Sequence, residues 1–210
     1  MLLIPGVYRV VGNKGCNSYV IETKGGLVVI DVGFLGSERA IKRYIEMQVG
    51  ASTDDIIYVV LTHAHRDVAE ALPDLLAYCP NARVIIHEEE VGLLRRISRA
   101  VEYMDLTKIR EDREVKDAGI KIISTPGHTP GSISILYDSS IFVGDLLYVS
   151  SSGLELPKQN YDKTMLIESL KKIALLAPNA MFPAHGRPIT KGAKQKLDEF
   201  IKTLISKQST

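Results

Sequence analysis

The stretch LTHAHRDVAE, residues 61–70, limits what this chain can fold into more than any other part of the sequence. It directly follows Ile56–Leu61, a continuous apolar run typical of a strand buried on both faces. Three potential metal ligands then occupy alternate positions, namely His63, His65 and Asp67. Imidazole and carboxylate groups packed this closely at a strand end suit zinc, iron or manganese.

Other candidate ligands also fall where an expected strand meets a loop. His128 lies in the rigid loop Pro126–Gly131, and His185 follows a short apolar segment. Asp145 ends another apolar strand, in the segment FVGDLLY. Loops at strand ends are where folds commonly place reactive groups. Any one of these residues alone could be a structural histidine or a helix cap, but the combination indicates a metal site.

The pattern of apolar residues predicts two packed sheets with helices on their outer faces. Strands are predicted at Val7–Val11, Ser18–Glu22, Leu27–Asp31, Ile56–Leu61, Val84–His87, Arg113–Lys116, Ile120–Ser124, Ile133–Tyr137, Ile141–Val143 and Met181–Phe182. Helices are predicted at Ser37–Gln48, Val68–Tyr78, Glu88–Met104, Lys163–Leu176 and Lys191–Ile205. Because no linker, repeat or composition shift is visible, we expect a single domain over residues 1–210.

Composition argues against several classes of function. The net charge is +1 with scattered Lys and Arg, which disfavours nucleic-acid binding. The apolar runs are too short to span a bilayer, and the start MLLIPGVYRV lacks the basic residues of a secretory signal. Cys16 and Cys79 form no metal or redox motif and are expected to be small buried hydrophobes. We therefore expect a cytoplasmic protein with a small-molecule substrate and neither a nucleic-acid nor a membrane partner; helix-rich surfaces are compatible with a homodimer.

Four motifs in order, THAHRD, TPGHTPGS, VGDLLY and FPAHGRPI, resemble the metallo-β-lactamase-fold superfamily of metallohydrolases. The segment IDVG at Ile30–Gly33 matches a further element of that family. Intervals of 63, 17 and 40 residues separate His65, His128, Asp145 and His185 in turn, and these intervals fit the family. The resemblance implies an α+β fold, a four-layer αββα sandwich with the site at one edge of the two sheets.

The resemblance also implies a ligand set. A first metal would be held by His63, His65 and His128, and Asp145 would bridge toward a second metal held also by Asp67 and His185. Asp67 is in addition the residue expected to take part in catalysis. The family pattern HxHxDH supplies a further second-site histidine where this chain has Val68, so we expect a weaker second site. One or two Zn²⁺ ions are expected, with iron or manganese as alternatives.

Three further residues are expected near the site. The family uses the position of Asp31 to support a ligand histidine by accepting its other N–H. His87 ends the next strand and could donate a hydrogen bond, replace the lost ligand, or cap the helix expected from Glu88. Glu70 lies three residues after Asp67 on the same helical face, so it could reach toward the site, but it is expected to be a solvated surface side chain.

The expected reaction is hydrolysis, in which the metal lowers the pKa of bound water to about 7 and the hydroxide attacks a carbonyl. The segments GHTPGS and GDLLY most resemble the glyoxalase II-like branch, which implies a thioester such as hydroxyacyl-glutathione. Only one helix is expected after His185, so the helical domain that holds glutathione in true glyoxalase II is expected to be missing, and another ester, thioester or lactone stays open. The alternatives are a mononuclear iron enzyme resembling the persulfide dioxygenases and a non-catalytic metal-binding relative.

Overall fold

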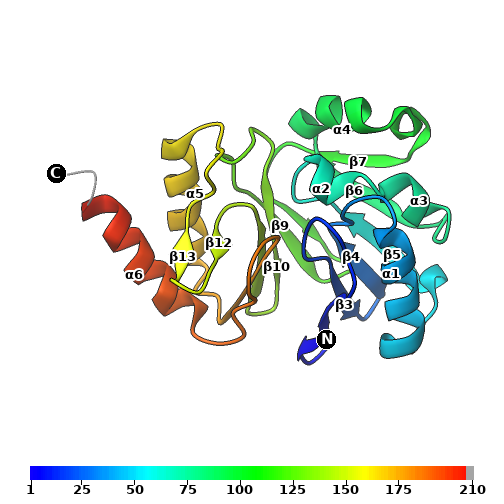
Figure 1. Ribbon diagram of the computed structural model, residues 1–210, viewed down its shortest axis with the longest axis horizontal. Coiled ribbons are helices and arrows are strands. Elements are labelled where there is room, and N and C mark those ends of the chain that lie inside the picture. The colour runs from blue at the N-terminus through cyan, green and yellow to red at the C-terminus, as the bar shows by residue number, and fades with distance from the viewer. Residues whose placement is uncertain (207–210) are drawn as a thin grey trace.

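Two β-sheets form the middle of the molecule, and the computed structural model describes them within residues 1–206 (Figure 1). The first sheet has, in spatial order, β1 (Leu2–Ile4), β2 (Val7–Arg9), β3 (Tyr19–Thr23), β4 (Gly26–Ile30), β5 (Ile56–Val60), β6 (Arg83–His87) and β7 (Leu106–Ile109). The second has β14 (Ala180–Pro183), β11 (Ser140–Gly144), β10 (Ile133–Tyr137), β9 (Ile120–Ser124) and β8 (Arg113–Val115). A separate hairpin is made by β12 (Tyr148–Val149) and β13 (Leu154–Glu155).

Strand direction explains the apolar run that leads into the first ligands. The strands β4, β5, β6 and β7 are parallel neighbours, whereas β1 to β4 pair antiparallel. Central parallel strands are covered on both faces, so their residues are apolar at successive positions rather than at alternate ones. Strand β5 fits this pattern, because four of its five residues are buried.

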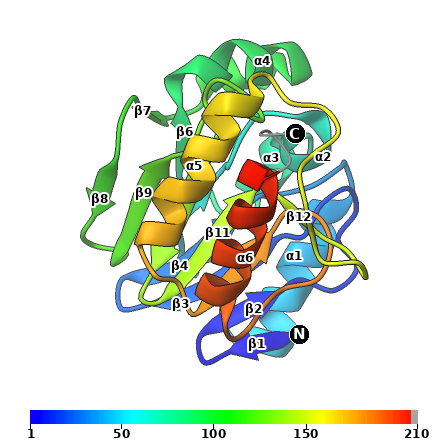
Figure 2. The ribbon, with the colours of Figure 1, turned by 90° about the vertical axis from the view of Figure 1, so that its left-hand side faces the viewer.

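Three apolar layers hold the four-layer αββα sandwich together. Between the sheets, Tyr19 packs edge-to-face on Phe142, and Phe142 packs on Phe182 with ring centroids 4.9 Å apart. The outer face of the first sheet is covered by α1 (Ser37–Tyr44), α3 (Leu72–Leu76) and α4 (Val91–Ile97). The outer face of the second sheet is covered by α5 (Lys163–Leu175) and α6 (Ala193–Ser206), which cross it in Figure 2. No helix in the described residues is both long and apolar enough to cross a membrane.

The helix predicted at Val68–Tyr78 is wrong in its continuity. The structure has two short helices there, α2 (Arg66–Ala69) and α3. The helix is interrupted because the carbonyl of Val68 accepts hydrogen bonds from the amides of Val32 and Gly33, at 2.8 and 2.9 Å, instead of an amide of the next helical turn. This break ties the segment that follows the ligands to the loop after β4.

Other boundaries also differ from the predictions. The segment predicted as one helix at Glu88–Met104 consists of η3 (Glu88–Glu90), α4 and η4 (Arg99–Tyr103). Helix α1 passes into a π-helical turn, η1 (Ile45–Val49), and a 3-10 turn, η2 (Thr53–Asp55), precedes β5. Strands β1 and β7 and the β12–β13 hairpin were not predicted, because two to four residues at a sheet edge or in an isolated hairpin carry little periodic signal.

Candidate metal centre

The candidate ligands come from both sheets and meet at one edge of the sandwich. His63, His65 and Asp67 follow the first-sheet strand β5. The second sheet supplies the other three from the segments after β9, β11 and β14, namely His128, Asp145 and His185. The structure thus brings together six side chains that span more than half of the chain.

Three histidines and one aspartate form the densest part of this cluster. The rings of His63, His65 and His128 lie 4.7 to 4.8 Å apart, centroid to centroid, with their planes nearly perpendicular. One nitrogen of each ring and one carboxylate oxygen of Asp145 all lie within 4.8 Å of one another. The Nε2 of His128 is 2.9 Å from His65 Nδ1 and 3.4 Å from Asp145 Oδ2. Four donor atoms therefore surround one small space.

The chemistry of these donors fits a metal ion. Among the described residues, His63 Nε2 and Asp145 Oδ1 are buried and have no hydrogen-bond partner, which is a costly arrangement for polar atoms without a ligand. Burial, with the other histidines nearby, lowers the pKa of His63 well below its usual range and that of His128 to about 4. Both imidazoles are therefore neutral at pH 7, the form in which histidine binds a metal.

Asp67 and His185 form the second half of the cluster. Their side chains share a contact of 3.0 Å between His185 Nε2 and Asp67 Oδ2. This hydrogen bond lowers the pKa of Asp67 and raises that of His185. His185 Nε2 also lies 3.6 Å from Asp145 Oδ1, so the Asp145 carboxylate faces both halves of the cluster.

Val68 is fully buried beside this second half. Its side chain packs with Cys16 and Ala184, the residue before His185, in a small apolar cluster. Burial is the main cause of a strongly raised pKa of the Cys16 thiol. Besides lacking the donor atom of a histidine, Val68 contributes to apolar packing between the three chain segments that carry Cys16, Val68 and Ala184.

Asp31 was predicted to accept a hydrogen bond from a ligand histidine, but its partner in the structure is Thr62, the residue before His63. Its buried carboxyl group accepts hydrogen bonds from the backbone amide of Thr62, at 2.8 Å, and from the Thr62 hydroxyl. The same hydroxyl lies 3.1 Å from His63 Nδ1. Asp31 thus acts on His63 through Thr62, and burial raises the pKa of Asp31 to about 8.

His87 and Glu70 have local partners. His87 Nδ1 accepts the amide of Glu89 at 3.3 Å, which makes His87 the cap of η3, and its Nε2 lies 3.2 Å from the carbonyl of Arg110. Glu70 was expected to be solvated, but its carboxylate pairs with Arg66 and accepts the amide of Leu35. Neither residue has a contact with the six clustered side chains among the interactions of the described residues.

Sequence reasoning missed two residues that contact the site or its loops. The hydroxyl of Tyr148 donates to Asp145 Oδ2 at 3.1 Å, and its ring packs edge-to-face on His185. Glu90 accepts amides from both histidine-bearing loops and is buried. Tyr148 could have been found as an aromatic residue inside the VGDLLY motif, whereas a run of three glutamates gives no sign of which one is buried.

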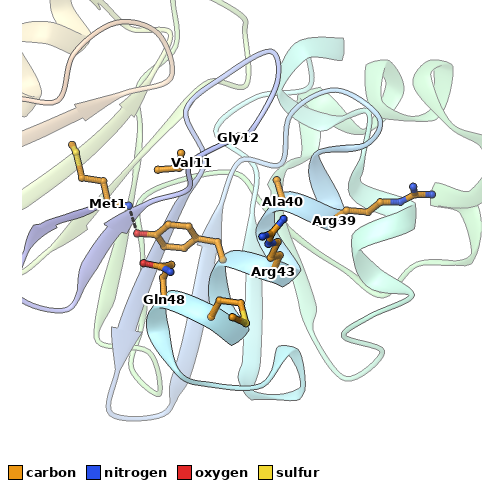
Figure 3. Close-up of a pocket in the computed structure, with 9 residues that line it drawn as sticks. Met1, Val11, Gly12, Arg39, Ala40, Arg43 and Gln48 are labelled. Carbon is orange, nitrogen blue, oxygen red and sulfur yellow. Dashed lines mark hydrogen bonds between the residues drawn. The ribbon is translucent and has the colours of Figure 1, made fainter.

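A cleft of about 510 Å³ opens beside the cluster, lined by His65 and His128, by Leu93 and Arg96 of α4, and by Tyr161. This volume falls in the range of small-molecule sites. A second groove, of about 580 Å³, lies against α1 (Figure 3). None of the six clustered side chains lines that groove, so the cleft beside the histidines is the candidate substrate site.

Comparison with known proteins agrees with this geometry. The sequence model of the metallo-beta-lactamase superfamily matches residues 11–185. A probable metallo-hydrolase of Methanocaldococcus jannaschii is 31% identical over 161 residues, which cover 76% of this chain and 71% of the relative. The crystal structure of an archaeal metallo-beta-lactamase superfamily protein from Sulfolobus tokodaii has a TM-score of 0.72 at 22% identity, covering 95% of this chain and 86% of the other. The crystal structure of a quorum-quenching N-acyl homoserine lactone lactonase has a TM-score of 0.62 at 22% identity, covering 81% and 79%.

Proposed function

Since the chain belongs to the metallo-β-lactamase superfamily and is a metal-dependent hydrolase, we propose that it cleaves the acyl bond of a small ester, thioester or lactone. The observation that carries this proposal is the buried cluster in which His63 Nε2 and Asp145 Oδ1 have no hydrogen-bond partner. The cleft of about 510 Å³ beside the cluster supports a small substrate. The lactonase fold neighbour adds lactones to the classes worth testing.

The proposal gives each clustered residue a role. His63, His65 and His128 would hold a first divalent metal together with Asp145, and Asp67 and His185 would hold a second one with it. The metal supplies a Lewis acid that polarises a carbonyl and acidifies water. Asp67 lies at the open side of the cluster, where it is half-buried, and its ionised carboxylate can accept a hydrogen bond from an incoming nucleophile and orient it. The hydroxyl of Tyr148 orients the Asp145 carboxylate between the two halves.

Unequal metal sites form part of the proposal. The first set has three imidazoles, and zinc is the metal that such a donor set suits best. The second set lacks an imidazole at position 68, where Val68 is enclosed by apolar neighbours. A single-metal enzyme is therefore compatible with this chain, which keeps an iron dioxygenase as the competing activity.

The decisive experiment combines metal content with a substrate panel. Protein purified without chelator is measured for metal per chain by mass spectrometry and is then assayed on matched thioesters, esters and lactones. We expect zinc or manganese, hydrolysis of one acyl class, its loss after dialysis against chelator and its return with metal. Stoichiometric iron, with oxygen uptake on persulfides and no hydrolysis, would assign the competing oxidation instead.

A further inference from the structure

Glu90 connects the two loops that carry the clustered histidines. Its Oε2 accepts the backbone amide of Ala64, between His63 and His65, at 2.8 Å. Its Oε1 accepts the amide of Gly131, in the loop of His128, at 3.0 Å. We propose that Glu90 is a positioning residue that fixes the spacing of these two loops and thereby sets the metal affinity of the histidine site.

Burial makes this connection strong. Only 2% of Glu90 is exposed, and both of its carboxylate oxygens are used by the two amides. Hydrogen bonds from amides to a carboxylate are stronger than neutral ones, and losing the acceptor leaves buried amides unsatisfied. Glu90 therefore holds both loops at a defined separation before any ligand arrives.

The packing around Gly131 shows how closely the loop is held. A Cβ at this position would lie 2.8 Å from Glu90 Cγ, 2.9 Å from its Oε1 and 2.9 Å from His87 Nδ1. Only glycine lets the loop amide approach the carboxylate this closely. His87, which caps η3, thus forms one wall of the space in which Glu90 meets the loop.

Metal binding depends on such spacing. Nitrogen ligands bind zinc at about 2.0–2.1 Å, and functional sites tolerate displacements of only about 0.5 Å. His65 and His128 follow strands of different sheets, and their facing nitrogens are 2.9 Å apart. A residue that bonds the backbone of both loops, next to His65 at Ala64 and in the loop of His128 at Gly131, controls whether both nitrogens can reach the same ion.

The test compares Glu90→Gln with Glu88→Gln, a neighbour whose carboxylate pairs with Arg110 on the surface. The glutamine keeps the shape of Glu90 but turns an N–H toward one of the two amides. We expect a roughly 10–100-fold loss of zinc affinity in chelator competition for Glu90→Gln, the size typical of residues that orient metal ligands, and an altered visible spectrum of the cobalt-substituted protein. Glu88→Gln should match wild type in both.

The effect on metal affinity rests on the proposed function, because it requires the protein to bind a metal. Amide exchange in the metal-free protein tests the loop connection without any metal. By NMR, the amides of Ala64 and Gly131 should exchange faster in Glu90→Gln and not in Glu88→Gln. If wild type bound no metal, the proposed function would fail while the exchange data still judged the loop connection. Unchanged exchange at both amides would overturn the role of Glu90.

Gly131→Ala provides a second variant that acts from the other side of the contact. Its Cβ must displace Glu90, so it should reproduce the affinity loss and the altered cobalt spectrum without changing any charge. This variant decides the question if Glu90→Gln does not fold. A lowered melting temperature with wild-type zinc affinity and cobalt spectrum, in whichever variant folds, would make Glu90 a purely structural residue and contradict the proposal.

Discussion

His63 Nε2 lies 3.9 Å from Asp145 Oδ2, beyond hydrogen-bond distance, although both side chains are almost completely buried. Native structures satisfy most buried polar atoms, so exceptions point to a function or to a ligand. The two residues come from different sheets, and closing this gap with a direct hydrogen bond would remove donor atoms from the cluster. The fold keeps them apart and available to an ion.

The contrast between two histidines tests the cluster. His63→Ala should remove the metal of the histidine site and abolish hydrolysis, because His63 supplies one of four converging donors. His87→Ala should retain metal, because His87 caps η3 and contacts the carbonyl of Arg110. The measurement is metal per chain after gel filtration, with the melting temperature as a control for folding. Equal metal loss in both variants would place His87 among the ligands.

Val68→His should raise metal occupancy of the second half of the cluster. The imidazole restores a donor next to Asp67, but it must enter the space shared with Cys16 and Ala184. We therefore expect the metal-free variant to be less stable by about 1–3 kcal/mol, the usual cost of overfilling a core. Metal per chain at matched free zinc and urea unfolding of the metal-free protein measure the two effects.

Val68→Leu is the matched control, since it enlarges the side chain without adding a donor. It should be destabilised like Val68→His and should gain no metal. A wild-type protein that already holds two tightly bound ions, with no gain from the histidine, would show that another group completes the second site.

Tyr148→Phe isolates one hydroxyl. The change removes the hydrogen bond to Asp145 Oδ2 and keeps the ring that packs on His185. We expect at least a tenfold loss of kcat or of second-site metal affinity, since partners that orient a ligand typically contribute 10–100-fold. Because Asp145 Oδ2 is also the oxygen that faces His63 and His128, metal affinity at the histidine site should fall too, but the three imidazoles should still retain the ion. Unchanged kcat and unchanged metal binding would mean that the Asp145 carboxylate is held adequately by its other neighbours.

Asp31→Asn should change the pH dependence of stability in the metal-free protein. Burial raises the pKa of Asp31 to about 8, so between roughly pH 4 and 8 the folded state holds a proton that the unfolded chain has released. Raising the pH through this window therefore lowers the free energy of unfolding, and asparagine removes that contribution. Asparagine also tolerates the φ of 57° at this position.

The measurement is urea unfolding of both proteins at several pH values from 5 to 8. The stability of wild type minus that of Asp31→Asn should fall steadily as the pH rises. A difference that stays constant with pH would show that Asp31 titrates normally in the folded protein.

The architecture was predictable because its long elements carry strong periodic patterns. Strands β9 and β10 were predicted to the residue, and α5 within one residue. The break between α2 and α3 was not predictable, since it depends on the Val68 carbonyl being taken by amides from residues 32 and 33. Such a contact between distant segments leaves no local signal.

The candidate site shows the same division. The six clustered residues were singled out because each lies shortly after a strand within a recognisable motif, and the structure brings them together. Glu90 and Tyr148 were missed because their importance lies in which atoms they meet in space. Asp31 was predicted to contact a ligand histidine directly, whereas the Thr62 hydroxyl lies between Asp31 and His63. The spacing of residues in a sequence does not reveal such an intervening group.

The origin of the clustered residues in both sheets has a consequence for how the protein matures. A nascent chain that has reached β7 carries His63, His65 and Asp67 but none of the other three. The first strand of the second sheet, β8, starts only after that point. We expect a chain that ends at β7 to bind metal weakly. Metal binding should therefore follow the packing of the two sheets against each other and take place in a nearly folded protein.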